Sequence, residues 1–404
     1  MKVSIIGQGY VGLTIAEGAA SAGYEVIGYD IDRLLISNLT QGQTHVPGLN
    51  SDSLKYLISR NLYTPTSSPE QLYDSNIYIL AVPTPLDNNR LPDLSALGSA
   101  AELVSKIIKR GCLVINESTS HPGTLRNFIR PLIDPKGDLQ VLFAVAPERV
   151  DPGNSIWALK NTPRVISGLN GVAIDRAIEF YSKICDFIYR APSAEIAEAS
   201  KLFENTFRHV NIALVNEFSL IADKIGFSAH EAIRAASTKP FGYMPFYPSI
   251  GVGGHCIPID PIYLTEASKN VGEKTPLIDA ATEINLLMTS KVVKRIQEYL
   301  KKDLKGLKIQ IAGISYKNDV SDMRESPAVS LMQQLEKLGA LVSWHDPVVK
   351  SFQDKLSEPI NPAIDLGLIV TPHTQIDFSI WKNCGANVLD LSANLSNYGW
   401  PKFL

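Results

Sequence analysis

The chain has 404 residues, a formal net charge of −3, 45% hydrophobic residues and 20% charged residues. These values are ordinary for a globular protein of two or three domains, and they exclude a general electrostatic attraction to nucleic acid. No apolar run is long enough to span a bilayer and no secretory signal precedes the first strand pattern, so we expect a cytoplasmic protein with no nucleic-acid or membrane partner.

The first part of the chain alternates strand and helix patterns. A helical pattern over Val11–Ala22 connects the first two of a series of short apolar runs that stop at polar or breaker residues. These runs are predicted strands: Val3–Ile6, Glu25–Tyr29, Ile77–Val82, Leu113–Asn116 and Val141–Val145. Strands that alternate with helices predict a doubly wound parallel sheet.

The middle and the end of the chain differ from each other. Glu195–Ile225 has apolar residues at helical spacing and few breakers, which predicts one long connecting helix, and Thr275–Tyr299 resumes this pattern after a Gly- and Pro-rich interruption. Strand and helix patterns then return over Lys308–Ala312, Val329–Leu338, Leu341–Trp344, Leu366–Val370 and Val388–Leu391. We therefore expect an α/β chain in which two Rossmann-like doubly wound parallel-sheet domains, residues 1–192 and 301–404, flank a central helical domain, residues 193–300.

A glycine motif follows the first predicted strand. Gly7, Gly9 and Gly12 form the pattern GxGxxG around Tyr10 and Val11, and Asp30 ends the second strand 18 residues after Gly12. This context is that of a dinucleotide fingerprint, with the pyrophosphate at the helix N-terminus and the acid on the ribose hydroxyls. A carboxylate there favours NAD over NADP, although the nearby Arg33 weakens that preference. The alternative is a glycine-rich turn in another kind of α/β domain.

The four cysteines are far apart, and neither they nor the seven histidines form a metal-binding or disulfide pattern, so we expect no metal. Three of them are expected to be small buried residues. Cys256 differs, because it follows Gly251-Val252-Gly253-Gly254-His255 and precedes Asp260 by four residues. A glycine-rich approach would let a substrate reach a nucleophilic thiolate, but a buried cysteine beside a turn is an equal alternative on this segment alone.

Several ordered motifs show that the chain resembles the UDP-glucose/GDP-mannose dehydrogenase family over essentially its whole length. They are Gly7–Leu13, Val82–Pro85, Glu117–Thr124, Ala146–Arg149, Glu198–Lys201 with Asn205, Gly253–Pro261, and Tyr316-Lys317 leading to Arg324–Pro327. The resemblance implies a four-electron oxidation of the C6 alcohol of a UDP-sugar by two NAD⁺ in turn. It implies a covalent thiohemiacetal and then a thioester on Cys256.

The resemblance also implies supporting catalytic roles. Lys201 would stabilise the negative oxygen, and Asn205 would share its helix face one turn away. Asp260 would assist proton removal, and Glu148 would act as the base for thioester hydrolysis. A solvated helix lysine would be the ordinary interpretation of Lys201 without the matching motif.

Other residues are expected to contact the cofactor. Thr84, Glu117, Thr119 and Ser120 follow predicted strands, where doubly wound sheets bind ligands, and either Thr119 or Ser120 would hold the catalytic water. Arg324 resembles a family arginine that reaches the cofactor from the third domain, the alternative being a surface arginine at a helix start.

The identity of the sugar depends on the cysteine loop. Ile259 stands where the UDP-glucose branch has a lysine, and His255 precedes the cysteine, so the loop resembles that of UDP-N-acetylhexosamine dehydrogenases. So do Ala146–Asn154 and Thr238–Pro248, and we expect UDP-N-acetylglucosamine to be the substrate. The alternatives are UDP-glucose, UDP-ManNAc and UDP-GalNAc. The residues expected to bind the substrate are Glu148, Arg149, Lys201, Asn205, Lys239, Phe246, Tyr247, Gly253 and Lys317.

Two other classes of function stay open at this point. A two-electron alcohol dehydrogenase on the same scaffold would not need Cys256, and a catalytically silent nucleotide-sugar-binding protein would not reduce NAD. The long apolar middle helix is typical of a dimer core, so we expect a homodimer or a higher homo-oligomer. The sequence leaves open which pathway, such as polysaccharide biosynthesis, uses the product.

Overall fold

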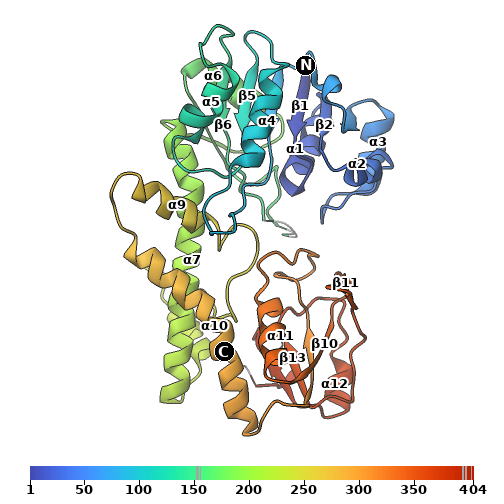
Figure 1. The fold of residues 1–404 in the computed structure, drawn as a ribbon, viewed down its shortest axis with the longest axis vertical. Coiled ribbons are helices and arrows are strands. Elements are labelled where there is room, and N and C mark those ends of the chain that lie inside the picture. Colours follow the sequence, from blue (N-terminus) through green and yellow to red (C-terminus); the bar gives the residue numbers. More distant parts are fainter. Residues whose placement is uncertain (152–153, 155, 394, 396–397, 402) are drawn as a thin grey trace. The chain divides into compact units, whose positions relative to one another are not determined.

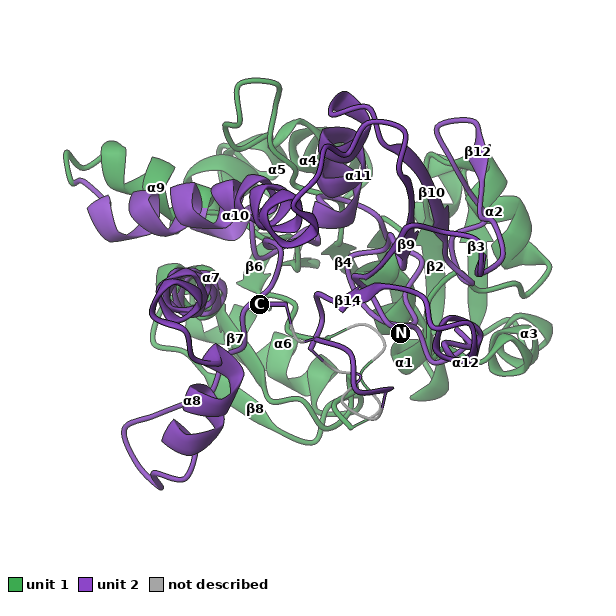
Figure 2. Cartoon of the chain, turned by 90° about the horizontal axis from the view of Figure 1, so that it is seen from below, with its two compact units in different colours: residues 1–204, 262–273 green, residues 205–261, 274–404 purple. Residues whose placement is uncertain are grey.

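The structure of the protein is a computed structural model that describes residues 1–404 except 152–153, 155, 394, 396–397 and 402. The chain divides into two compact units, residues 1–204 with 262–273 and residues 205–261 with 274–404, which Figure 2 draws in green and purple. This division differs from the three expected domains, whose boundaries at residues 192 and 300 stay predictions. Pro152 and Gly153 of the expected Ala146–Asn154 motif lie outside the described residues.

The first unit is built on an eight-stranded sheet with the order β3-β2-β1-β4-β5-β6-β7-β8. Figure 1 labels β1, β2, β5 and β6 of this sheet. The strands from β3 to β6 are mutually parallel. Their order is that of dinucleotide-binding folds, in which ligands bind where the strand order reverses, here between β1 and β4. The strands are β1 Lys2–Ile6, β2 Glu25–Tyr29, β3 Tyr63–Thr66, β4 Ile77–Leu80, β5 Leu113–Asn116, β6 Leu142–Val145, β7 Arg164–Gly168 and β8 Ile188–Arg190.

The far edge of this sheet departs from the wholly parallel arrangement expected from the sequence. Strand β7 pairs antiparallel with β6, and β8 pairs parallel with β7. Parallel neighbours need a crossover, usually a helix, whereas the described residues between β6 and β7 form no helix. The core of the doubly wound fold is therefore confirmed, with two extra strands added in the opposite direction.

Both faces of the first sheet are covered, because successive strand residues point to opposite sides. Ile77 and Ile79 of β4 pack with α1, α2, α3 and α6, whereas Tyr78 and Leu80 pack with α4, α5 and the first turn of α7. The helices of this unit are α1 Tyr10–Ser21, α2 Arg33–Thr40, α3 Ser51–Ser59, η1 Pro69–Leu72, α4 Ser95–Ser105, η2 Leu125–Ile129, α5 Arg130–Ile133 and α6 Gly171–Tyr181.

The middle of the chain is helical, as expected. The long helix α7 spans Ala194–Ile225 and is followed by α8 Ala229–Ala236, α9 Asp260–Lys269 and α10 Pro276–Leu300. Residues 237–259, where glycine and proline are frequent, form neither helix nor strand. None of the helices in the described part of the chain is long and apolar enough to span a membrane.

The second unit contains a smaller sheet with the order β10-β9-β13-β14, in which all strands are parallel. Its strand order reverses between β9 and β13, which makes this a second doubly wound fold. Helices α10 and α11 cover one face and Trp381 of α12 covers the other. The elements are β9 Lys308–Ala312, α11 Pro327–Lys337, β10 Leu341–His345, β11 Ser351–Phe352, β12 Lys355–Leu356, β13 Leu366–Ile369, α12 Ser379–Asn383 and β14 Val388–Asp390.

Candidate active site

The turn between β1 and α1 has the geometry of a phosphate-binding loop. Gly7 has φ of +94°, and a side chain there or at Gly12 would collide with the backbone of Ala81 or of Gly7 itself. Gly9 differs, since a Cβ built on it meets no atom within 4 Å. Gly9 caps α1 without a side-chain hydrogen bond, and the first turn of the helix carries no acidic residue, so its backbone N–H groups and positive end favour an anion. These residues fit the pyrophosphate of a dinucleotide.

Asp30 lies at the end of β2 in the same unit. Its carboxylate accepts hydrogen bonds from the backbone N–H of Gln8 at 2.7 Å and of Asp32 at 3.0 Å. The first bond ties the carboxylate to the glycine turn and orients it beside the start of α1. Tyr10 and Val11 open that helix half-buried, and Arg33 is exposed at the start of α2. The geometry fits the expected contact of Asp30 with the adenosine ribose.

Polar side chains follow β4 and β5, the strands next to β1. Thr84 and Ser120 are buried, and Thr119 is half-buried. The Asn116 amide donates to the Ser120 hydroxyl at 3.3 Å, and the hydroxyl of Tyr263 in α9 donates to the Thr84 carbonyl at 3.1 Å. These residues lie near the point where the strand order reverses, which is where such folds bind ligands. Their expected contact with the cofactor stays a prediction.

Glu117, directly after β5, is a buried carboxylate. Its side chain is buried, and its carboxylate accepts hydrogen bonds from the Arg164 guanidinium and from the Tyr181 hydroxyl. Arg164 is also buried, stacks over the Tyr181 ring at 4.9 Å and donates to the Ala146 carbonyl at 3.1 Å. A removed partner would leave an uncompensated buried charge, so Glu117 stabilises this edge of the sheet. Its expected contact with NAD stays a prediction.

Glu148 and Lys201 form the polar centre of the first unit. Burial raises the pKa of Glu148, and the Lys201 ammonium opposes that increase. The Glu148 carboxylate also accepts a hydrogen bond from the Val150 N–H at 2.7 Å, with Arg164 at 3.5 Å. A carboxyl group with a raised pKa can act as a base near neutral pH, the role expected for Glu148.

Glu198, one turn before Lys201 on α7, is a buried carboxylate that the sequence analysis left without a role. It accepts hydrogen bonds from the backbone N–H of Gly123 at 2.6 Å and of Leu125 at 2.8 Å. Burial raises the pKa of Glu198 to about 7, despite these bonds. Glu198 thus holds the end of the segment that carries Thr119 and Ser120.

The second unit brings three of the expected catalytic residues together. The Asn205 amide donates to the Asp260 carboxylate at 2.5 Å, and the Asp260 N–H donates to the Cys256 carbonyl at 2.9 Å. Asp260 is 2% exposed, and α9 begins at this residue, whereas the Cys256 thiol is half-buried. A buried carboxylate held by an amide and a reachable thiol are the groups that general-base and covalent catalysis need.

The glycines before Cys256 let the loop approach two other residues closely. A Cβ on Gly253 or Gly254 would lie 2.9 Å from the Tyr316 side chain, and the Gly254 N–H donates to the Arg324 carbonyl at 3.0 Å. The hydrogen bond to Asp322 raises the pKa of Arg324, and the charge of a Cys256 thiolate adds to this increase. The guanidinium is therefore within electrostatic reach of the sulfur, and Gly253 is needed for packing as well as for any substrate contact.

The cysteine loop is anchored at both ends by a buried polar network that the sequence analysis missed. The Asn216 side chain accepts from the Ser249 N–H at 2.8 Å and donates to Asn285 at 3.0 Å. Asn285 in turn donates to the His209 carbonyl at 3.1 Å, and the ring of His209 contacts the backbone of Ile257. Burial lowers the pKa of His209 to about 4, so the network is neutral at physiological pH.

The remaining residues expected to bind substrate lie in varied surroundings. Arg149 makes a bidentate pair with Glu204 at 2.8 and 3.1 Å. Lys239 is exposed beside the Phe241 ring, Phe246 packs on Phe207, and Tyr247 stacks on His230. Lys317 is half-buried in the turn after β9. Contacts of all these residues with a substrate stay predictions.

Comparison with known proteins gives one consistent result. Descriptions of the UDP-glucose/GDP-mannose dehydrogenase family match residues 1–185 as the NAD binding domain, 195–286 as the central domain and 310–393 as the UDP binding domain. The chain is similar to UDP-N-acetyl-D-mannosamine dehydrogenase of Pyrococcus horikoshii, with 36% identity over 96% of this chain and 93% of that protein. It is also similar to UDP-N-acetyl-D-glucosamine 6-dehydrogenase of Pseudomonas aeruginosa, with 31% identity over 96% and 92%.

Solved structures agree with these relatives. The fold is similar to that of UDP-D-ManNAc dehydrogenase from Pyrococcus horikoshii, with a TM-score of 0.87, 34% identity and coverage of 96% of this chain and 95% of that chain. It is also similar to a UDP-glucose dehydrogenase from Pyrobaculum islandicum, with a TM-score of 0.86, 25% identity and coverage of 96% and 93%.

Proposed function

The chain belongs to the UDP-glucose/GDP-mannose dehydrogenase family of NAD-dependent UDP-sugar 6-dehydrogenases, and we propose that it oxidises a UDP-N-acetylhexosamine to its uronic acid through a covalent bond to Cys256. The observation that carries the covalent route is the joined arrangement of Asn205, Asp260 and Cys256 in one compact unit. When bound, NAD⁺ supplies the hydride acceptor for both oxidation steps.

The chain's own residues remove the proton of the alcohol and bind the aldehyde. Asp260, held by Asn205, assists removal of the C6 hydroxyl proton as the alcohol becomes an aldehyde. The Cys256 thiolate then forms a C–S bond to C6, and the electron pair of the carbonyl bond moves to oxygen. The Lys201 ammonium stabilises that oxyanion. Loss of a second hydride leaves a thioester on Cys256, so the half-oxidised sugar never leaves the enzyme.

Hydrolysis of the thioester completes the sequence. Glu148 takes a proton from water, water adds to the acyl carbon, and the C–S bond breaks with the electron pair returning to sulfur. The raised pKa of Glu148 supports this role, because a stronger base accepts the proton of water more readily. The product is a carboxylate, and each sugar yields two NADH.

The sugar is proposed to be a UDP-N-acetylhexosamine. Ile259 and His255 favour this class over UDP-glucose, as the sequence analysis argued. UDP-GlcNAc was the sugar predicted from the sequence, whereas the relatives at 34–36% identity are named for UDP-ManNAc and those at 31% for UDP-GlcNAc. We therefore propose UDP-ManNAc as the first candidate and UDP-GlcNAc as the second.

The test is NADH formation by purified protein with UDP-ManNAc, UDP-GlcNAc, UDP-GalNAc, UDP-glucose and GDP-mannose. We expect two NADH per sugar and the highest kcat/KM with a UDP-N-acetylhexosamine. Cys256→Ser should form no carboxylate. Cys384, which was expected from the sequence to be buried, is exposed, and Cys384→Ser should match the wild type. One NADH per sugar, or undiminished acid from the Cys256 variant, would refute the covalent route.

We also propose that the protein forms a homo-oligomer through α7. Phe207, Leu214 and Ile221 are spaced seven residues apart on this helix, and with Ile225 they are 43 to 70% exposed in the described chain. An exposed apolar stripe at this spacing is typical of a helix–helix interface. Leu214→Asp should lower the molar mass in light scattering to that of one chain, whereas Lys294→Asp on α10 should not. A wild-type protein that is monomeric at micromolar concentration would refute this proposal.

A further inference from the structure

The sheet of the second unit repeats the turn geometry of the nucleotide-binding sheet. Gly313 follows β9 with φ of +81°, as Gly7 follows β1, and each glycine donates its N–H to the last residue of the neighbouring strand at 2.8 Å. Asp346 directly follows β10 as Asp30 directly follows β2, and its carboxylate accepts from the Ile314 N–H at 2.9 Å. The same device thus occurs once in each unit.

The two carboxylates differ in what they can bind. Asp30 is half-buried, whereas Asp346 is 1% exposed. Asp346 accepts hydrogen bonds from backbone N–H groups of its own turn and of the turn after β9. The His373 ring lies 3.0 Å from its Oδ2. Its backbone donors are Ile314, Ser315, Val348 and Val349. Asp346 is therefore committed to internal bonds and is not available to the ribose of a second dinucleotide.

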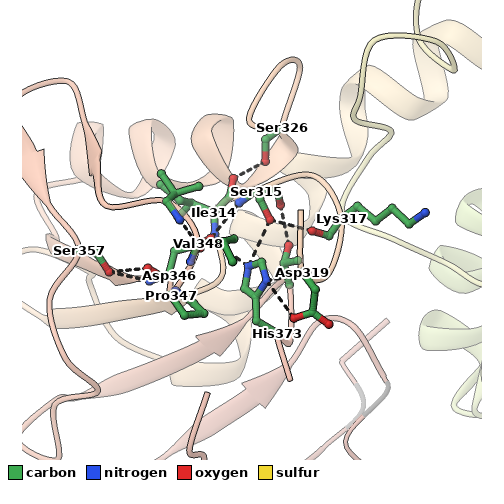
Figure 3. Close-up of polar contacts among 12 residues, drawn as sticks. Ile314, Ser315, Lys317, Asp319, Ser326, Asp346, Pro347, Val348, Ser357 and His373 are labelled. Atoms are coloured by element: carbon green, nitrogen blue, oxygen red, sulfur yellow. Dashed lines mark hydrogen bonds and ion pairs between the residues drawn. The ribbon is translucent and has the colours of Figure 1, made fainter. Parts of the chain in front are cut away.

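His373 connects this carboxylate to the turn after β9 (Figure 3). The Asp319 N–H donates to its Nδ1 at 2.8 Å, so Nδ1 is the acceptor and Nε2 carries the proton toward Asp346. The Ser315 hydroxyl lies 3.2 Å from the same Nε2 and donates to the Lys317 carbonyl at 2.9 Å. The side chain of His373 is fully buried, so each of these bonds is protected from water.

The turn held in this way is strained. Asp319 has φ of +59°, a left-handed conformation that is unfavourable for a residue with a side chain. It is kept there by the bond to His373 and by Thr374, whose N–H and hydroxyl both donate to the Asp319 carboxylate, at 2.9 and 3.0 Å. These bonds hold Asp319 in its left-handed conformation.

The strained turn carries two residues that bear on the site. Tyr316 packs against Gly253 and Gly254, which lie three and two residues before Cys256. Figure 3 shows the Lys317 side chain extending away from His373 and Asp346, with its ammonium outside their cluster. A displacement of the turn would therefore move both the cysteine loop and a cation.

We propose that His373 is a positioning residue for the oxidation. With Asp346 it fixes residues 314–319, so that Lys317 is presented to the diphosphate of the nucleotide sugar and Tyr316 keeps the Cys256 loop in its reactive position. The role of Lys317 rests on the proposed function. The packing of Tyr316 on the loop does not.

Two variants each keep one of the hydrogen bonds that His373 makes to Asp319 and Asp346 and remove the other. In His373→Asn the Oδ1 atom can replace Nδ1 as the acceptor for Asp319, whereas in His373→Gln only the donor to Asp346 is preserved. We expect His373→Gln to weaken UDP binding in calorimetry about tenfold, because the part-buried Asp319 N–H loses its acceptor and no longer holds the turn. His373→Asn keeps the acceptor for Asp319 but loses the bond to Asp346, so its loss of UDP affinity should be smaller, about threefold. NAD affinity should be unchanged in both variants, whereas thermal unfolding should fall modestly in both, because each lacks one bond of a buried side chain. His345→Gln, at a half-buried histidine of the same unit, is the matched control.

The second readout is the rate at which iodoacetamide alkylates Cys256, measured by peptide mass spectrometry with the exposed Cys384 as the internal reference. His373→Gln should change that rate at least threefold, and His373→Asn should not. If His373→Gln fails to fold, Thr374→Val replaces it, since it removes one bond to Asp319 at an exposed position and should shift both readouts in the same direction. Unchanged UDP affinity and unchanged alkylation in the folded variant would overturn the proposal. A wild type that binds no UDP would refute the proposed function instead, and the alkylation rates would then decide the role of His373.

Discussion

The amide of Asn205 donates a hydrogen bond to the carboxylate of Asp260 over 2.5 Å, although 55 residues separate them in the chain. Asp260 in turn donates its backbone N–H to the Cys256 carbonyl. One side chain of the long helix α7 is therefore linked through a buried acid to the loop that carries the thiol. A change at Asn205 should thus act on the chemistry and leave the cofactor site intact.

Asn205→Ala is expected to lower kcat about a hundredfold, the usual scale for loss of a properly held acid–base group. The KM for NAD should not change, because the glycine turn and Asp30 lie elsewhere in the chain. Steady-state kinetics with both substrates varied measures the two effects. Asn383→Ala, an exposed asparagine on α12, is the control and should match the wild type. Equal losses in kcat and in NAD affinity would show that Asn205 acts on the whole fold.

Gly9→Val should lose NAD affinity but keep its folding stability, whereas Gly7→Ala should lose folding stability. A side chain on Gly9 meets no protein atom within 4 Å, so Gly9→Val should fold normally but occupy the place of the pyrophosphate. We expect its Kd for NAD to rise at least about tenfold with unchanged thermal unfolding. Gly7→Ala should lose about 2 kcal/mol or more of folding free energy, since φ is +94° and Ala81 blocks a Cβ. Fluorescence titration with NADH and urea unfolding measure these outcomes, and normal NADH binding by Gly9→Val would contradict the assignment.

Local patterns predicted the elements well, but not the contacts that depend on how distant segments meet. The expected strands Glu25–Tyr29, Leu113–Asn116 and Lys308–Ala312 are present with those bounds, because buried parallel strands are short apolar runs between breakers. The direction of β7 depends on the path of the chain after β6, and that path has no periodicity to detect. The catalytic residues were predicted from a family resemblance, and their spacing alone would not have separated Cys256 from a buried cysteine.

The supporting residues were missed for a physical reason. Glu198 is one acid on a long helix that carries several others, and only its burial against Gly123 and Leu125 distinguishes it. His209 and His373 were two of seven scattered histidines, and their partners lie 76 and 27 residues away. A helical plot of α7 would have shown Glu198 and Lys201 on adjacent turns, which was the one signal available.

Glu198 should make stability fall as pH rises through neutrality. Its pKa is about 7 in the folded chain, above the ordinary 4.5, so the folded state holds a proton that the unfolded state releases. The contribution is complete below pH 4.5 and is lost between pH 4.5 and 7, by at most about 3 kcal/mol. Glu198→Gln has no charge to bury and should show a flatter curve of unfolding free energy against pH over this window.

The comparison is made by urea unfolding of both proteins at steps between pH 5 and 8. The two proteins should be similarly stable at pH 5, where both side chains are neutral, and the wild type should become the less stable of the two toward pH 8, where folding must bury a charged carboxylate. Glu195, on the same helix, should not titrate in this range, because a hydrogen bond to Arg126 lowers its pKa to about 2. Parallel curves for the wild type and Glu198→Gln would show that Glu198 stays ionised over the whole range.

His209 should make the unfolding free energy fall as the pH becomes acidic. Burial lowers its pKa to about 4, so the unfolded chain binds a proton between pH 6.5 and 4 that the folded chain refuses. The contribution to stability is complete above pH 6.5 and is lost as pH falls toward 4, by at most about 3 kcal/mol. His209→Gln stays neutral throughout, so its unfolding free energy should fall less steeply over this range. Because burial and not a neighbouring charge lowers the pKa, 0.5 M NaCl should leave the difference between the two curves in place, whereas a difference abolished by salt would point to an electrostatic cause.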